Sequence, residues 1–326
     1  MQIFRLSTAG LLISPLFWLS VQAAESLPFR SGDVVAFLGG SDVVGAQFNG
    51  YLEALLTIGS LGGSPVLPRT EGVRFRSFAW EGDTVYAQPR EIGFPNVHDL
   101  LKSNAVNVAI LQFGRIEALE GAKRLPEFKA AYAKLLEKCF QQTSRLILVT
   151  PPPYESPGGF LPDLGKRNTD LESYVRVTAE LANQNKLPLI DIFHELGGTN
   201  HHDLKLTDNG LQLTERGHAS VAEAFARQAA IRRFPSVLTN AGFERLRQAI
   251  IAKNKLWFDY SRPQNWAFLG GDRVSVPSSR DHVDPKVRWF PAEMQKFLPL
   301  IEAKEKEIAE LAQELAGGSR GSSPHH

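Results

Sequence analysis

The sequence contains very little cysteine, with the single residue Cys139 among 326. One cysteine cannot form a disulfide within the chain, so the stability of the fold has to come from its hydrophobic core. Cys139 falls within an apolar helical pattern over residues 132–140. This setting favours a small buried side chain over the alternative, a reactive thiol.

Strong charge of one sign is also absent. The formal net charge is +1, and no long block of like charges occurs. Nucleic acids and anionic membrane surfaces bind to concentrated positive charge, so the sequence gives no indication of either partner. We expect a neutral small molecule or a glycan as the partner. The sequence does not indicate an oligomeric state.

Several sequence motifs of cofactor and metal sites are missing. The glycines near residue 40 follow neither the dinucleotide-binding pattern nor the P-loop pattern, which argues against a phosphate cradle. No group of Cys, His, Asp and Glu has the spacing of a structural zinc site. We therefore predict no cofactor and no metal.

The N-terminal residues have the pattern of a secretory signal peptide. Arg5 precedes an apolar run over residues 6–21, and a small-residue cleavage pattern ends at Ala23. A membrane anchor is the alternative, but Ser14-Pro15 interrupts the run, which is shorter than the roughly 20 residues of a membrane span. We predict a signal peptide over residues 1–23 and a secreted or periplasmic protein, with no membrane attachment after cleavage.

Segments typical of strands and helices alternate from residue 33 onward. The predicted strands cover residues 33–38, 106–113, 145–150 and 187–193, and the predicted helices cover residues 43–56, 128–140, 171–184 and 214–232. The strands are apolar almost throughout, which is typical of a parallel sheet with helices on both faces. We therefore predict an α/β domain over residues 24–234.

The pattern changes after this domain. Residues 256–291 are rich in Trp, Arg, Pro and Gly without a sustained period, and residues 291–315 return to a helical pattern. We predict a C-terminal extension over residues 235–316, irregular and then helical. Residues 317–326 are predicted to be a disordered tail.

A serine stands where the first strand runs into the first helix. Residues 37–42 read Phe-Leu-Gly-Gly-Ser-Asp, which places Ser41 at the carboxyl end of the strand, the edge at which open α/β sheets bind ligands. Ser41 alone is also consistent with a helix cap.

Four blocks in order make the sequence similar to the SGNH or GDSL-type ester hydrolases. The first is Gly39-Gly40-Ser41, and the second is Trp80-Glu81-Gly82-Asp83-Thr84. The third is Gly114-Arg115-Ile116-Glu117, and the last runs from Leu206 to Thr214. The resemblance covers residues 33–232. Residues 257–315 also resemble the C-terminal part of a planctomycete-type branch of the family.

The resemblance implies a three-layer α/β/α sandwich with a mostly parallel, flavodoxin-like sheet, and it implies an ester hydrolase. Ser41 would be the nucleophile, and the backbone N–H of Gly82 would help to form the oxyanion hole. The oxyanion asparagine is replaced by Ile116, the catalytic aspartate by Asn209 and the catalytic histidine by Gln212. Because glutamine cannot take the proton of a serine hydroxyl, we expect catalysis by the family mechanism to be impaired.

Another histidine would have to replace the missing base. His282 is the candidate if the Trp-rich segment folds back over the sheet, since acidic residues on either side could orient it. His201 and His202 precede the last block and are expected near its edge. His218 lies one helical turn beyond the block and is expected to point elsewhere.

Two classes of function remain open. One is an ester hydrolase acting on acyl or acetyl groups, with glycans as possible substrates. The other is an inactive relative that acts as a glycan-binding or protein-binding module. Four tryptophans could stack on sugar rings, although packing of the extension onto the core is the favoured explanation for each of them: Trp80, Trp257, Trp266 and Trp289.

Overall fold

The computed structural model describes Leu27 and residues 29–62, 72–201, 205–229, 231 and 240–318. The predicted signal peptide lies outside the described residues, and so does the predicted tail beyond Gly318. Within the described ranges, no helix is long and apolar enough to cross a membrane.

A five-stranded parallel sheet forms the centre of the molecule. Its strand order is β2-β1-β3-β4-β5, the flavodoxin-like order, as expected from the resemblance. The strands are β2 (Arg74–Ser77), β1 (Val34–Gly39), β3 (Val108–Gln112), β4 (Arg145–Val149) and β5 (Leu189–Ile190). The sequence pattern did not predict β2, because this four-residue edge strand reads Arg-Phe-Arg-Ser and has only Phe75 as an apolar residue.

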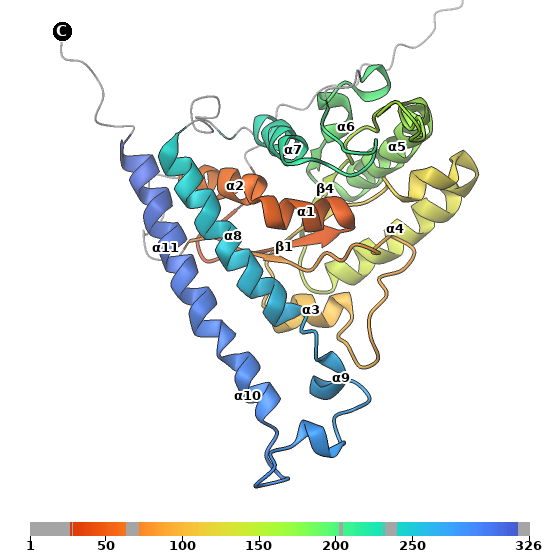
Figure 1. Ribbon diagram of the computed structural model, residues 1–326. Helices are drawn as coiled ribbons and strands as arrows, with labels where there is room; N and C mark the ends of the chain where they lie inside the picture. Colours follow the sequence, from red (N-terminus) through yellow and green to blue (C-terminus); the bar gives the residue numbers. More distant parts are fainter. Residues whose placement is uncertain are drawn as a thin grey trace, which may run out of the picture.

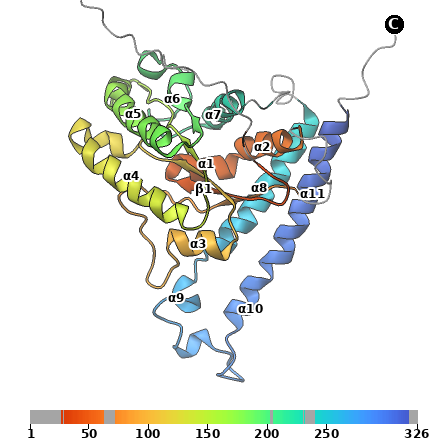
Figure 2. The ribbon, with the colours of Figure 1, turned by 180° about the vertical axis from the view of Figure 1, so that it is seen from behind.

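Helices cover both faces of the sheet, which confirms the predicted three-layer sandwich (Figures 1 and 2). Alternate residues of β1 point to opposite faces, and all six are buried. The helices on one face are α1 (Ser41–Asn49), α2 (Tyr51–Gly62) and α7 (Glu215–Gln228); those on the other are α3 (Val97–Ser103), α4 (Leu125–Phe140) and α5 (Asn168–Asn185).

Gly50 divides what the sequence pattern predicted as one helix over residues 43–56. Its φ of 71° is left-handed, a conformation that glycine adopts without a Cβ clash, and its N–H closes α1 on the carbonyl of Ala46. The remaining short elements are η1 (Glu117–Glu120), η2 (Ala122–Arg124), η3 (Gly165–Arg167), α6 (Ile192–Glu195) and η4 (Gly198–Asn200).

The C-terminal extension contains two long helices that lie side by side along the core (Figures 1 and 2). They are α8 (Ala241–Ser261) and α11 (Phe297–Gly318), and only α11 was predicted from the sequence. Between them, α9 (Trp266–Leu269), η5 (Pro277–Ser279) and α10 (Trp289–Gln295) form a tip that projects beyond the core.

Buried polar contacts join the extension to the α/β core. Lys253 of α8 is 1% exposed and forms an ion pair of 2.6 Å with Glu53 of α2. Asn254 donates a hydrogen bond of 2.9 Å to the same carboxylate. Burial lowers the pKa of Lys253, and the Glu53 carboxylate opposes this shift. The first helix of the extension is therefore part of the packed core.

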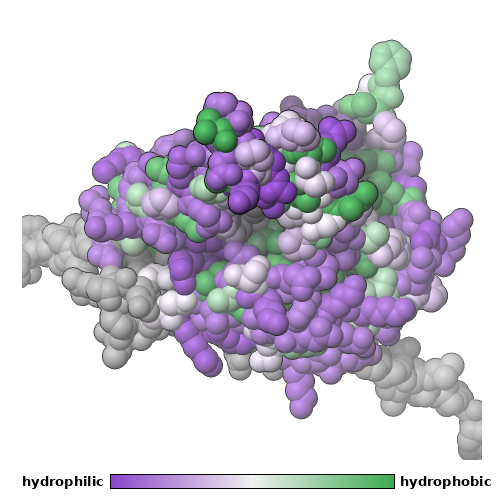
Figure 3. Space-filling model, turned by 90° about the horizontal axis from the view of Figure 1, so that it is seen from below, coloured by the Kyte–Doolittle hydropathy of each residue, from purple (hydrophilic) through white to green (hydrophobic). Residues whose placement is uncertain are grey.

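The tryptophans of the extension mainly pack against the core. Trp257 is 2% exposed and its indole N–H donates to the carbonyl of Ser77. Trp266 packs against Phe94. Trp289 is 42% exposed and stacks on Phe290. On the face seen in Figure 3, hydrophobic side chains form small separate groups among hydrophilic ones.

Cys139 is fully buried in α4, which confirms that it packs in the core. Burial raises the pKa of its thiol to about 12. A thiol with that pKa stays protonated at neutral pH and is a poor nucleophile.

Candidate functional site

A cleft of about 450 Å³ opens at the carboxyl edge of the sheet, where the chain leaves β1 and β3. In this strand order, these two strands form the switch point at which α/β sheets bind ligands. The cleft brings together four positions of the family blocks, Ser41, Ile116, Asn209 and Gln212. Gly82 is not one of its lining residues, although both of its neighbours in the chain are.

One side of the cleft is a face of α1. This face follows helical spacing and consists of Ser41, Val44, Gly45, Phe48 and Asn49, and the neighbouring Asp42 also lines the cleft. Ser41 is at the end of this face that borders the sheet. Phe48 is 39% exposed and adds apolar surface to the other end.

Ser41 is exposed and is the first residue of α1, whereas Gly40 holds the cap position. The alternative that Ser41 caps the helix is therefore wrong. Its hydroxyl donates a hydrogen bond of 3.0 Å to the carbonyl oxygen of Glu81. A carbonyl oxygen accepts a hydrogen bond but is far too weak a base to remove the proton, so this contact orients the hydroxyl without activating it.

The first block of the ester hydrolases that the sequence resembles reads Gly-Asp-Ser, and Gly40 stands at the position of its aspartate. A Cβ atom at this position would lie 2.9 Å from the carbonyl oxygen of Asp83, which is closer than real Cβ atoms approach. The loop after β2 therefore packs directly on the backbone before Ser41. Glycine is required here because of that close approach.

The loop after β2 is fixed by aromatic and ionic contacts. Arg90 and the buried carboxylate of Asp83 form a two-pronged ion pair of 2.6 and 2.8 Å. The guanidinium groups of Arg90 and Arg262 lie 4.4 and 4.3 Å from the ring of Trp80. Arg262, at the end of α8, also bonds Glu81 at 2.8 Å. The extension thus supports the loop whose carbonyl orients Ser41.

Burial raises the pKa of Asp83, and the hydrogen bonds and charge of Arg90 oppose that rise. Gly82 itself has open space on the side where a Cβ would point. Its backbone conformation is not in the left-handed region. Neither observation places its N–H at the cleft.

The third block contributes an apolar side chain and a buried carboxylate. Ile116 is 38% exposed and offers no hydrogen-bond donor from its side chain to an oxyanion. Glu117 is 3% exposed and accepts hydrogen bonds of 2.9 Å from the backbone N–H groups of Gly114 and Val85. Burial raises the pKa of Glu117, and these hydrogen bonds oppose the rise. Glu117 therefore joins the loops after β2 and β3.

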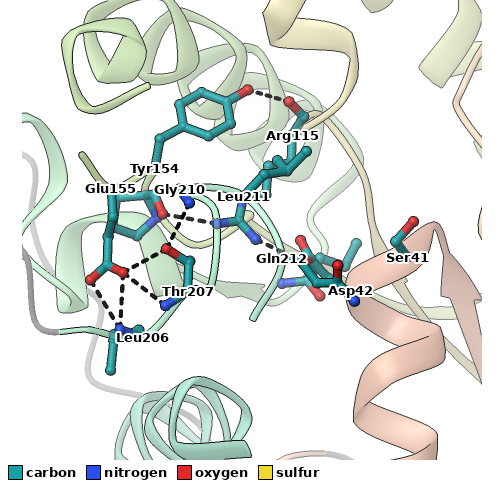
Figure 4. A network of polar contacts seen from close by, with 12 residues as sticks. Ser41, Asp42, Arg115, Tyr154, Glu155, Leu206, Thr207, Gly210, Leu211 and Gln212 are labelled. Atoms are coloured by element: carbon teal, nitrogen blue, oxygen red, sulfur yellow. Dashed lines mark hydrogen bonds and ion pairs between the residues drawn. The ribbon is translucent and has the colours of Figure 1, made fainter. Parts of the chain in front are cut away.

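Arg115 anchors the floor of the cleft, a role that the sequence did not reveal. Its side chain is 4% exposed, forms an ion pair of 2.8 Å with Asp42 and donates to the carbonyl of Pro153 at 3.1 Å. Tyr154 donates its hydroxyl proton to the backbone carbonyl of Arg115. Figure 4 shows this network, with Ser41 beside it and not joined to the other residues drawn.

The last block, residues 206–214, forms a turn, but it lacks the catalytic aspartate and histidine that the resemblance implies. The side-chain oxygen of Asn209 accepts hydrogen bonds from the backbone N–H groups of Leu211 and Gln212 at 3.0 and 2.7 Å. Asn209 is thus used as a turn residue, a function that asparagine and aspartate both perform. Gln212 is exposed at the cleft.

A buried glutamate, Glu155, holds the start of this block in place. It is 3% exposed and accepts hydrogen bonds from the N–H groups of Leu206 and Thr207 at 2.9 and 2.8 Å. It also accepts from the Thr207 hydroxyl at 2.7 Å (Figure 4). In addition, it contacts Nε2 of His201 at 3.1 Å. Burial opposes ionisation, but these hydrogen bonds outweigh it and lower the pKa of Glu155.

The histidines are placed differently from what the sequence suggested. His282 is exposed in the projecting tip and does not line the cleft, so the structure does not place it where a substitute base would act. The side chain of His201 is 1% exposed and is held by Glu155 and the carbonyl of Leu196. His202 lies outside the described residues. His218 was expected to point elsewhere, and this was wrong, because it lines the cleft.

Within the described part of the chain, no group of three or more His, Cys, Asp and Glu residues is placed to hold a metal ion. The cleft offers a serine hydroxyl, the imidazole of His218, amide side chains at Asn209 and Gln212, and apolar surface at Ile116 and Phe48.

No family model matches the sequence, and no curated protein matches it significantly. Structure comparison finds an α/β hydrolase from the metagenome of Lake Arreo, Spain, at 14% identity and a TM-score of 0.46, covering 63% of this chain and 99% of that one. It also finds an acetylxylan esterase from Geobacillus stearothermophilus, at 16% identity and a TM-score of 0.43, covering 63% and 98%. A lipase/acylhydrolase from Enterococcus faecalis has 20% identity and a TM-score of 0.39, covering 60% and 94%.

Proposed function

We propose that the protein is an exported ester hydrolase of the SGNH type, with Ser41 as the nucleophile and with impaired turnover by the family mechanism. The supporting observation is the cleft itself. Ser41, Ile116, Asn209 and Gln212 come from three distant segments, and all line one cleft at the switch point of the sheet.

The impairment follows from two missing groups. Removing the base from a Ser-His-Asp unit lowers turnover about 10⁶-fold, equivalent to about 8 kcal/mol of barrier. Removing one oxyanion donor costs about 10²-fold to 10³-fold. Gln212 and Ile116 stand at these two positions. The two losses in rate need not multiply, because the effects of residues that act as a unit are not additive.

The substrate would be a small ester, with an acyl group on a glycan as one possibility. The proposed stacking of sugars on tryptophan has little support, because no tryptophan is among the described residues that line the cleft. The apolar surfaces of Ile116 and Phe48 are available to the acyl part of a substrate instead.

The test is hydrolysis by the chain from residue 24 onward, with a short-chain nitrophenyl ester and an acetylated xylan as substrates. Wild type and Ser41→Ala are compared, and a serine-directed fluorophosphonate is used to label the protein. We expect slow hydrolysis that Ser41→Ala abolishes, and labelling at Ser41. Equal rates in both proteins and no label at Ser41 would exclude Ser41 as a nucleophile.

A binding module is the second candidate, favoured by the hydrogen bond from Ser41 to the carbonyl of Glu81. In that bond the hydroxyl has no strong base as its partner. If the protein is a binding module, we expect wild type and Ser41→Ala to bind a ligand in the cleft with equal affinity. Binding of acetylated and unmodified glycans can be measured by calorimetry. If the folded protein binds none of them, the hypothesis of a glycan-binding module is excluded.

A further inference from the structure

His218 is the one histidine among the described residues that line the cleft. It lies in the first turn of α7 and is 7% exposed, so it is more than nine-tenths buried. Its side chain makes no hydrogen bond to a described residue, although buried imidazoles usually have a partner. The fold thus brings a histidine with unused hydrogen-bonding capacity to the wall of the proposed active site.

The imidazole lies directly against Gly45 of α1. A Cβ atom added at Gly45 would be 2.4 Å from Nε2 of His218 and 2.6 Å from its Cε1. A side chain of any size at this position would displace the ring. Because Gly45 has no side chain, the imidazole can contact α1 through the edge that bears Nε2.

Gly45 and Ser41 are four residues apart on the face of α1 that lines the cleft. Side chains with this spacing have their Cβ atoms about 5–6 Å apart. Because Nε2 of His218 lies against the Cβ position of Gly45, it is about one helical turn from Ser41 on the same wall of the cleft, a span that one water molecule in the cleft can bridge. A general base can act directly or through one water.

We propose that His218 replaces the family's missing base by accepting the proton of Ser41 through one water molecule. This inference rests on the proposed function. The Ser41 hydroxyl turns from the carbonyl of Glu81 to the water. The serine oxygen bonds to the ester carbonyl carbon, the carbonyl electron pair moves to its oxygen, and the serine proton passes through the water to Nε2. The carbonyl then re-forms, the bond from its carbon to the alcohol oxygen breaks, and His218 returns the proton to the departing alkoxide. A second water hydrolyses the acyl group by the same route.

The charged groups facing His218 come from two other elements. Asp42 of α1 raises the pKa of His218, while Arg115 after β3 lowers it, and both act less strongly than burial, which lowers it. These two groups are themselves joined in an ion pair. The lowered pKa leaves the ring neutral at neutral pH and able to take a proton.

The experiment measures the rate at which a fluorophosphonate labels Ser41 between pH 5 and 9. For the wild type we expect a plateau at neutral pH and a fall on the acidic side, below the ordinary histidine pKa of 6.5. His218→Gln should label at least about 10²-fold more slowly, the usual contribution of a general base, and should lose this acidic fall. His194→Gln is the control, since His194 is exposed and bonded to Asp191.

Two further variants separate proton transfer from folding. Gly45→Ala should displace the imidazole and slow labelling at least about tenfold while α1 keeps its helix. His218→Ala should regain labelling when free imidazole is added to the solution. A variant whose only defect was structural would not be rescued in this way.

The outcomes distinguish the two proposals. A wild type that is labelled at Ser41, with an unchanged rate and pH profile in folded His218→Gln, would overturn the role of His218 and leave the hydrolase intact. A wild type that is not labelled at all would overturn both.

Discussion

Two sets of residues around the cleft differ sharply in how they are held. The frame residues, Arg115, Glu117 and Glu155, are 3–4% exposed. Glu117 and Glu155 each accept hydrogen bonds from backbone N–H groups of neighbouring loops, and Arg115 donates to the carbonyl of Pro153 and pairs with Asp42. The four positions taken from the sequence blocks, Ser41, Ile116, Asn209 and Gln212, are all exposed. The shape of the cleft is therefore maintained by groups outside these positions, and the exposed positions can be changed without dismantling it.

The largest effect is expected when a frame residue is removed. Glu155→Ala leaves the N–H groups of Leu206 and Thr207 without acceptors in a buried setting. Removing one partner of such a buried charged network typically costs about 3–5 kcal/mol. Urea unfolding should show this loss. Glu127→Ala is the control, because the side chain of Glu127 is 56% exposed and should change stability by less than about 1 kcal/mol.

Restoring the family residue at position 40 should cost less. In Gly40→Asp the new Cβ meets the carbonyl oxygen of Asp83 at 2.9 Å, so the loop after β2 has to move. Overpacking of this kind costs about 1–3 kcal/mol. Gly82→Ala on the same loop has open space around the new methyl group and serves as the matched control. Equal stabilities of the two variants would show that the loop is not closely packed on Gly40.

A smaller effect concerns acid stability. The pKa of Glu155 is lower in the fold than the ordinary value of 4.5, so its ionised form stabilises the folded state. This contribution is complete above pH 4.5 and is lost as the pH falls through the lower folded value. Wild type should therefore lose more stability than Glu155→Gln between pH 5 and pH 3. Parallel pH dependences in urea unfolding would contradict this assignment.

The sequence predicted the architecture because buried parallel strands are apolar at nearly every position. The strand at residues 145–149 and the helices of residues 125–140 and 168–185 were found this way, with small shifts at their ends. It did not predict β2 or α8. In α8, buried polar residues such as Lys253 and Asn254 interrupt the apolar pattern, and their partners on α1 and α2 are some 200 positions away in the chain.

The site was predictable only where the residues themselves follow a family pattern. Ser41, Ile116, Asn209 and Gln212 were identified by their positions in short blocks, and the structure brings them into one cleft. Glu155 and Arg115 carry no such signal, because a buried carboxylate or guanidinium is recognised by its partners. His218 was misjudged because its approach to the cleft depends on Gly45, a glycine inside a helix on another segment.

The central claim is that the cleft retains the frame of an ester hydrolase and lacks the family's base. The most direct test is the double variant Asn209→Asp with Gln212→His, assayed for hydrolysis of a short-chain nitrophenyl ester. Both positions are exposed, so stability should change by less than about 0.5 kcal/mol. We predict a rate at least about 10²-fold above wild type, abolished again by Ser41→Ala. A folded double variant with no gain would contradict the claim that the frame holds these positions in a hydrolase geometry.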